Sequence, residues 1–245
     1  MMIDISLHQE YIFSVFGINV SNTFFTSFVV TVILIIFSVI FFGKRDVEKS
    51  KLVNGARVLV FELLRVVDSI TENRELSKRV LPLVSSFFIF IITANLVALI
   101  PGFLGSFFID TGAGPVALLK SPNSDLTTTL ALAVFSVISI QIIALKELGL
   151  GGFLKRFFNF ESPIRFILGF FEIISESVKV ISFSFRLFGN VFAGEVLLVV
   201  IAFLVPYLIP VPFMVLEVFV GVIQAFIFAM LTLTFIKTSI VRHVA

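Results

Sequence analysis

Five long apolar stretches alternate with more polar stretches along the chain. About 20 apolar residues, rising about 1.5 Å each, form a helix that crosses a hydrocarbon core of about 30 Å. The pattern therefore predicts an all-α integral membrane fold in a single membrane domain over residues 1–245. Its five membrane helical segments are predicted at residues 24–42, 82–104, 126–145, 164–205 and 213–236.

A sixth helix is predicted over residues 56–70, and its pattern is amphipathic. Apolar residues recur at helical spacing and share the segment with charged ones: Val60, Leu63, Leu64 and Val67 against Arg57, Glu62, Arg65 and Asp68. Such a helix is typical of a segment lying on the membrane surface. Within the bundle, Asp125 is expected to cap the third membrane helix, and Asn95 to form a hydrogen bond between helices.

Composition agrees with a membrane protein and excludes several kinds of site. Hydrophobic residues make up 58% of the chain, and the mean hydropathy is +1.14. The chain has no Cys and only two His, both near its termini, which argues against thiol chemistry and a histidine metal site. No nucleotide-binding or hydrolase motif is present. We therefore expect no cofactor. No cleavable signal peptide is expected either. The net charge of +2 comes from loops, so we expect no nucleic-acid partner.

Lys and Arg are distributed unevenly between the loops, which predicts the orientation. Residues 43–80 contain nine, residues 146–165 contain four and the C-terminal tail contains two. Residues 105–125 contain only Lys120, and residues 1–20 contain none. Because cytoplasmic loops are enriched in Lys and Arg, the N-terminus is predicted outside and the C-terminus in the cytoplasm.

The fourth segment combines high apolarity with ionisable residues, each costing at least about 2.5–3.5 kcal/mol inside a membrane. Helical spacing aligns several of its polar and small residues into one stripe: Glu172, Ser175, Lys179, Ser182, Arg186 and Gly189. About 42 residues would extend roughly 63 Å, about twice the membrane core. Either the helix is strongly tilted, or it breaks near Gly169, Gly189 or Gly194.

The last segment carries polar residues of its own. Glu217 and Gln224 are seven residues apart on one helix face, with Gly221 between them. The short connection PYLIPVP predicts that this helix returns antiparallel beside the fourth, as a long helical hairpin. Glu195 and Glu217 should then lie at similar depth, with Gln224 deeper, towards Arg186.

Each of these residues also has a purely structural interpretation. Glu172 and Lys179 could be paired charges near the cytoplasmic side, Glu195 and Glu217 a structural pair, and Gln224 a contact between helices. Arg186 is harder to explain in this way, because no acidic residue lies three or four positions from it. Arg stays protonated in proteins, so it can attract a carboxylate without passing on a proton, whereas Glu can accept and release one.

Two stretches, SFRLFGNVFAGE and IPVPFMVLEVFVGVIQAFIFAMLTLTFI, resemble subunit a of the F-type ATP synthase, the stator of the membrane motor. NLVALIPG and SDLTTTLALA are also similar to that family. The resemblance implies that Arg186 engages the carboxylates of a rotating c-subunit ring and separates two half-channels. It implies proton access from outside along Glu195, Glu217, Asn190 and Gln224, and a cytoplasmic path near Glu172, Ser175 and Lys179. Many family members carry His where this chain has Glu217.

The resemblance further implies partners and a location. The partners would be the c-subunit ring, the b-subunit peripheral stalk, the rest of the ATP synthase and membrane lipid, with no catalytic site in this chain itself. A bacterial plasma membrane is favoured over a mitochondrial inner membrane. The coupling ion, H⁺ or Na⁺, is left open. A self-contained secondary transporter is the main alternative, although no internal repeat supports it, and a membrane-embedded enzyme lacks a nucleophile–base set.

Overall fold

The computed structural model describes residues 11–15, 18–43, 51–99, 108–110, 115–117, 120–158, 162–205 and 208–241. Its helices are α1 (Asn22–Gly43), α2 (Lys51–Thr71), α3 (Arg74–Leu99), η1 (Pro122–Ser124), α4 (Leu126–Phe157), α5 (Pro163–Leu204) and α6 (Pro210–Val241). Five of them, α1, α3, α4, α5 and α6, are long and apolar enough to cross a membrane. The chain is an all-α multi-pass membrane protein, as the hydrophobic pattern predicts.

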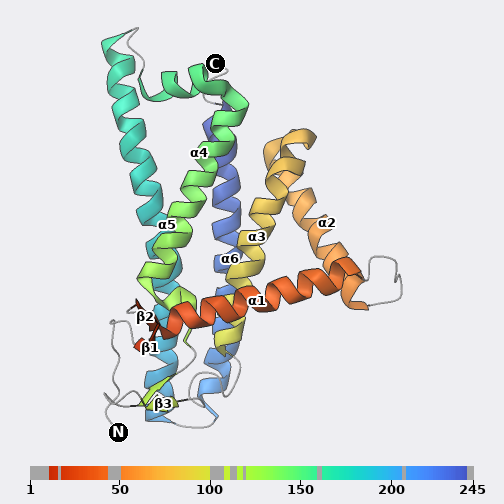
Figure 1. The fold of residues 1–245 in the computed structure, drawn as a ribbon, viewed down its shortest axis with the longest axis vertical. Helices are drawn as coiled ribbons and strands as arrows, with labels where there is room; N and C mark the ends of the chain where they lie inside the picture. Colours follow the sequence, from red (N-terminus) through yellow and green to blue (C-terminus); the bar gives the residue numbers. More distant parts are fainter. Residues whose placement is uncertain are drawn as a thin grey trace.

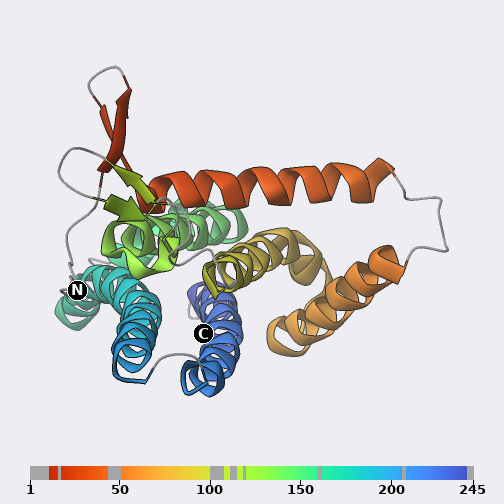
Figure 2. The same ribbon diagram turned by 90° about the horizontal axis from the view of Figure 1, so that it is seen from below.

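Four long helices, α3 to α6, run side by side, and α1 crosses their direction (Figure 1). Seen from below, α1 lies along one edge of the bundle and α2 lies beside α3 (Figure 2), with Leu63 and Val67 of α2 in the buried core. The start of α1 is tied to the start of α4, because the hydroxyl of Thr23 donates to Asp125 Oδ2 at 2.8 Å. The side chain of Asp125 also accepts from the backbone N–H of Thr127, so the predicted helix cap is confirmed.

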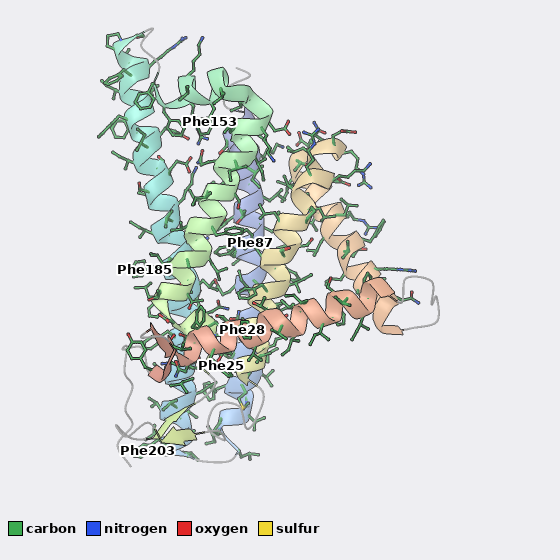
Figure 3. The ribbon with its side chains drawn as sticks, in the orientation of Figure 1. Phe25, Phe28, Phe87, Phe153, Phe185 and Phe203 are labelled. Atoms are coloured by element: carbon green, nitrogen blue, oxygen red, sulfur yellow. The ribbon has the colours of Figure 1, made fainter. Side chains whose placement is uncertain are left out.

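Aromatic rings from α3, α5 and α6 meet inside a core that is otherwise aliphatic. The ring of Phe228 lies 5.3 Å from that of Phe87 and 4.9 Å from that of Phe183. Other phenylalanines, such as Phe185 and Phe203, project from the bundle, as Figure 3 shows. Apolar side chains on the outside of a helix bundle suit contact with lipid, whereas a water-soluble protein carries mostly polar side chains there.

Hydroxyl groups join the core helices at two further points. Thr129 of α4 is bonded to Ser184 of α5 at 3.2 Å. Ser136 of α4 is bonded to Thr232 of α6 at 2.9 Å. Lipid tails are as apolar as the side chains, so the hydrophobic effect contributes little to helix association inside a membrane. Hydrogen bonds of this kind therefore help to hold membrane helices together.

Several helices are longer than the pattern predicts. α3 begins at Arg74 and continues through Pro82, and α6 extends from Pro210 to Val241. The predicted loop over residues 146–165 is largely wrong, because α4 continues to Phe157. It bends at Gly149, whose φ of 70° is strained for any residue with a side chain. We call residues 150–157, which follow this bend, the limb.

α5 is one continuous helix from Pro163 to Leu204, so the alternative of a break is wrong. Two of the three glycines considered as break points make room for neighbours instead. A Cβ at Gly169 would overlap the backbone carbonyl of Phe157, and one at Gly194 would overlap the carboxylate of Glu217. Both glycines therefore permit close packing, while Gly189 faces open space.

Two small antiparallel hairpins were not predicted. One joins β1 (Tyr11–Val15) to β2 (Ile18–Ser21), and the other joins β3 (Phe108–Asp110) to β4 (Pro115–Ala117). Residues 1–10 lie outside the described residues. The amphipathic helix over 56–70 is present within α2. Its place on the membrane surface stays a prediction.

Candidate functional site

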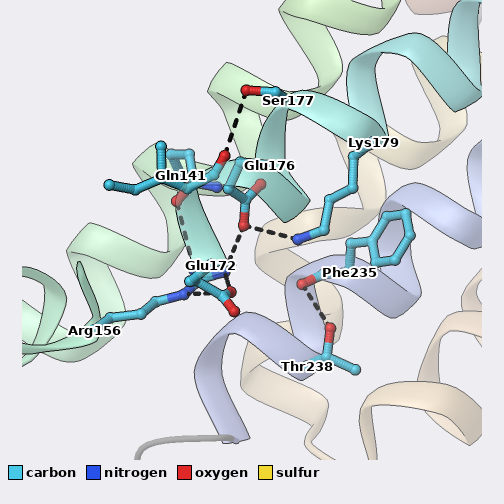
Figure 4. Close-up of polar contacts among 9 residues, drawn as sticks. Gln141, Arg156, Glu172, Glu176, Ser177, Lys179, Phe235 and Thr238 are labelled. Atoms are coloured by element: carbon cyan, nitrogen blue, oxygen red, sulfur yellow. Dashed lines mark hydrogen bonds and ion pairs between the residues drawn. The ribbon is translucent and has the colours of Figure 1, made fainter. Parts of the chain in front are cut away.

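A cluster of charged side chains joins α4 to the Pro163 end of α5. Arg156, on the limb, donates through Nε to Glu172 Oε1 at 2.9 Å and through Nη2 to Glu176 Oε1 at 2.5 Å. Lys179 pairs with the same Glu176 oxygen at 2.7 Å. Figure 4 shows these four side chains converging, and we call them the ion cluster. Two positive and two negative charges make its formal charge zero.

The ion cluster is shielded from its surroundings. The side chain of Arg156 is 4% exposed, and those of Glu172, Glu176 and Lys179 are 13–14% exposed. Lys179 also lies over the ring of Phe235 on α6, at 4.8 Å from its centroid. Charged side chains that are shielded to this extent are stable only when each one has an oppositely charged partner, and here each does.

The limb reaches α5 because of local backbone features. Figure 1 shows the last part of α4 turning across towards α5. The turn is made at Gly149, and Gly169 lets the backbone of Phe157 lie directly against α5. Arg156 stacks over the ring of Phe157 at 5.3 Å from its centroid, which further orients the guanidinium.

Arg186 has a different environment. It lies near the middle of α5 and is exposed on the outside of the bundle. Its backbone carbonyl accepts a hydrogen bond from Asn190 Nδ2 at 3.0 Å, and Asn190 is exposed as well. Within the described part of the chain, the guanidinium of Arg186 forms no hydrogen bond or ion pair. Arg186 is therefore exposed and unpaired within the described chain, near the middle of a helix that is long and apolar enough to cross a membrane.

A second group of polar residues lies further along the α5–α6 hairpin. The carboxylate of Glu217 lies against Gly194, the residue next to Glu195, and the two carboxylates interact electrostatically. Ser121 and Ser124 lie beside the carboxyl group of Glu195, whose Oε1 is buried without a hydrogen-bond partner among the described residues. The two glutamates thus lie together at similar depth, next to η1.

Asn95 connects this region to α3. Its Nδ2 donates to the carbonyl of Gly221 on α6 at 3.1 Å, and its Oδ1 accepts from Asn123 of η1 at 2.7 Å. The expected interhelical hydrogen bond of Asn95 is therefore confirmed. Gln224, one turn beyond Gly221, is 9% exposed. No hydrogen bond between Gln224 and Arg186 is present within the described residues.

The structure groups the predicted site residues into three places along α5. Glu172 and Lys179 belong to the ion cluster, while Ser175 is exposed nearby. Arg186 and Asn190 are open in the middle, and Glu195 and Glu217 are together near the other end.

Other polar residues that take part were not predicted: Arg156, Glu176, Gln141, Ser121 and Ser124. The four-residue spacing of Glu172 and Glu176 placed both on one helix face and could have indicated a cation from another segment. No comparable signal in the sequence linked the serines to Glu195.

Comparison with known proteins gives a consistent result. Residues 24–237 match the family described as ATP synthase A chain. ATP synthase subunit a of Moorella thermoacetica is 40% identical over 166 residues, covering 68% of this chain and 67% of that protein. ATP synthase subunit a of Gloeobacter violaceus is 32% identical over 225 residues, covering 91% and 85%. The chloroplastic subunit a of Stigeoclonium helveticum is 31% identical over 243 residues, covering 98% and 93%.

The family match extends over most of the chain and includes the charged stretch of α5 and the returning helix α6. This chain belongs to the ATP synthase A chain family, the family of subunit a.

Proposed function

We propose that this chain is the proton-translocating stator subunit in the membrane sector of an F-type ATP synthase. It forms two offset half-channels, which deliver protons to the carboxylates of a c-subunit ring and remove them again. Arg186 separates the half-channels, and the chain has no catalytic site of its own. Family membership supports the place in the complex. The distribution of charge along α5 and α6 supports the division of roles.

The open position of Arg186 is the observation that carries this proposal. A lone charge facing lipid costs at least about 2.5–3.5 kcal/mol, so an exposed arginine in mid-membrane needs an anionic partner. The described part of this chain supplies none. A carboxylate from another subunit satisfies the need, and a permanently charged guanidinium holds it without accepting its proton.

The other two polar places suit the two half-channels. Glu195 and Glu217 lie together near the Leu204 end of α5, where the predicted orientation puts the outside. Carboxylates can take up and release protons, so this pair fits the outer path, with Asn190 and Gln224 between it and Arg186. Glu172, Ser175 and Lys179 lie near the Pro163 end and fit the path to the cytoplasm.

The geometry of the helices supports a strong tilt of the α5–α6 hairpin. An unbroken helix of 42 residues is about 63 Å long, about twice the hydrocarbon thickness. α1 crosses the direction of α5 and α6, so these helices cannot all follow the membrane normal (Figure 1). Tilting brings a long stretch of α5 to membrane depth, where it can follow the surface of a ring.

Further partners and the location follow from the same proposal. The b-subunit peripheral stalk and the rest of the complex complete the stator, and lipid covers the remaining apolar faces. The protein resides in a membrane with its N-terminus outside and its C-terminus in the cytoplasm, and a bacterial plasma membrane is favoured.

The proposal is tested by ion movement in vesicles that contain the whole complex. We expect Arg186→Ala to abolish ATP-driven proton pumping while the complex still assembles, and to raise the passive proton leak. Arg65→Ala is the matched control, because Arg65 is an exposed arginine on α2, far along the chain from the hairpin. Pumping by Arg186→Ala at the rate of the control would overturn the separator role.

A further inference from the structure

Arg156 is the most buried charged residue among the residues described by the structure. The proposed function assigns no role to it. A buried ion pair is weak support for stability in itself, since well-packed apolar residues of similar volume often serve equally well. The question is therefore what two carboxylates and two cations do at this end of α5.

The contacts of Arg156 fix the positions of three other charged side chains. Its guanidinium reaches Glu172 and Glu176, and a planar fork of five N–H groups is suited to holding two carboxylates at once. Glu176 in turn holds Lys179 at 2.7 Å. Lys179 is seven residues from Arg186 and on nearly the same side of the helix, so Arg156 is linked to the face that carries Arg186.

The cluster also keeps unused hydrogen-bonding capacity. Arg156 Nη1 donates to Gln141 Oε1 at 3.5 Å, a long hydrogen bond. The amide nitrogen of Gln141 and the second carboxylate oxygen of Glu176 are buried and have no partner among the described residues. A donor and an acceptor beside fixed charges are the groups that a water molecule needs to bind within a proton path.

We propose that Arg156 is a positioning residue of the cytoplasmic half-channel. It holds the carboxylates of Glu172 and Glu176 in place and, through Glu176, the ammonium of Lys179, so that protons leaving the ring meet a neutral, ordered group of charges. This inference rests on the proposed function and adds to it a residue from α4 that acts through the side chains of α5.

The test measures ATP-driven pumping per assembled complex in vesicles. Arg156→Gln leaves two neighbouring carboxylates with only Lys179 between them, and we expect pumping to fall roughly tenfold or more, because misplaced groups in a transfer path are costly. Arg156→Gln combined with Glu176→Gln restores zero formal charge, and we expect it to recover a large part of the loss. Arg156→Lys, which keeps the charge but not the fork, should lie between Arg156→Gln and wild type.

The double variant tests charge balance, and Arg156→Lys tests whether the guanidinium fork is needed to position the carboxylates. If the double variant pumps no better per assembled complex than Arg156→Gln, or if Arg156→Gln or Arg156→Lys pumps like wild type, the inference is wrong. Where Arg156→Gln fails to assemble, Arg156→Lys and the double variant still decide, since wild-type pumping by Arg156→Lys together with failure of the double variant indicates packing alone. Arg186→Ala in the same vesicles keeps the two proposals apart, because its normal pumping would overturn the proposed function instead.

Discussion

Arg156 and Arg186 have the same side chain but differ in burial and in ion pairing. Arg156 is 4% exposed and bound by two carboxylates of its own chain. Arg186 is exposed, and its guanidinium has no partner within the described residues. A cation that is paired inside the chain contributes to holding helices in place. A cation left open at membrane depth indicates a site that another molecule completes.

The comparison explains why counting charges in a membrane helix is not enough to identify a functional residue. α5 carries Glu172, Glu176 and Lys179 as well as Arg186, yet the first three are balanced by one another and by Arg156. Of these four residues, only Arg186 has no ion-pair partner within the described chain. The same stripe therefore contains an internally closed part and an open part.

The largest disruption of the ion cluster is expected when both of its carboxylates, Glu172 and Glu176, are removed. Glu172→Ala combined with Glu176→Ala leaves Arg156 buried without an acid, and breaking a buried pair costs about 3–5 kcal/mol. We expect much less assembled complex and a lower temperature of thermal aggregation in detergent. Arg186→Ala, which removes an open charge, should leave both measurements close to wild type. Equal loss of assembly in the two variants would contradict the distinction between the arginines.

A smaller perturbation acts on the limb that carries Arg156. In Gly169→Ala the new Cβ overlaps the carbonyl of Phe157, so the limb must shift, at a cost of about 1–3 kcal/mol. We expect a moderate fall in thermal stability and in pumping. Gly55→Ala is the matched control, because a Cβ there meets nothing within 4 Å. Unchanged stability in Gly169→Ala would show that the limb does not need this close approach.

The sequence predicted those parts of the fold that depend on local pattern. Membrane helices are continuous in hydrophobicity, so all five were located, and the long fourth segment was recognised as too long for an upright span. The limb could not be predicted, because LKELGLGGFLKRF has the glycines and charges of a loop. Its place against α5 depends on the turn at Gly149 and on the contact of Arg156 with Glu172, and both involve tertiary packing.

The candidate site likewise combines features that local sequence pattern predicts with contacts that depend on tertiary packing. Arg186 stood out because no acid lies one helical turn away, and Glu195 and Glu217 were expected at similar depth because a short turn joins α5 and α6. The pairing of Arg156 with Glu172 joins residues 16 positions apart on different helices, which periodicity within one helix cannot reveal. The glycines at 169 and 194 were considered as possible break points in one of two alternatives, and only the packed structure shows which atoms they accommodate.

The central claim, that the open face of α5 meets a ring carboxylate, has a direct test in two matched serines. Ser182 is exposed on the face of Arg186, Ser184 is 0% exposed against α4, and the chain has no native Cys. We predict that Ser182→Cys forms a disulfide with a Cys placed beside the ring carboxylate in the assembled complex, and that Ser184→Cys does not. Cross-linking from position 184 alone, or from neither position in an assembled complex, would contradict the account.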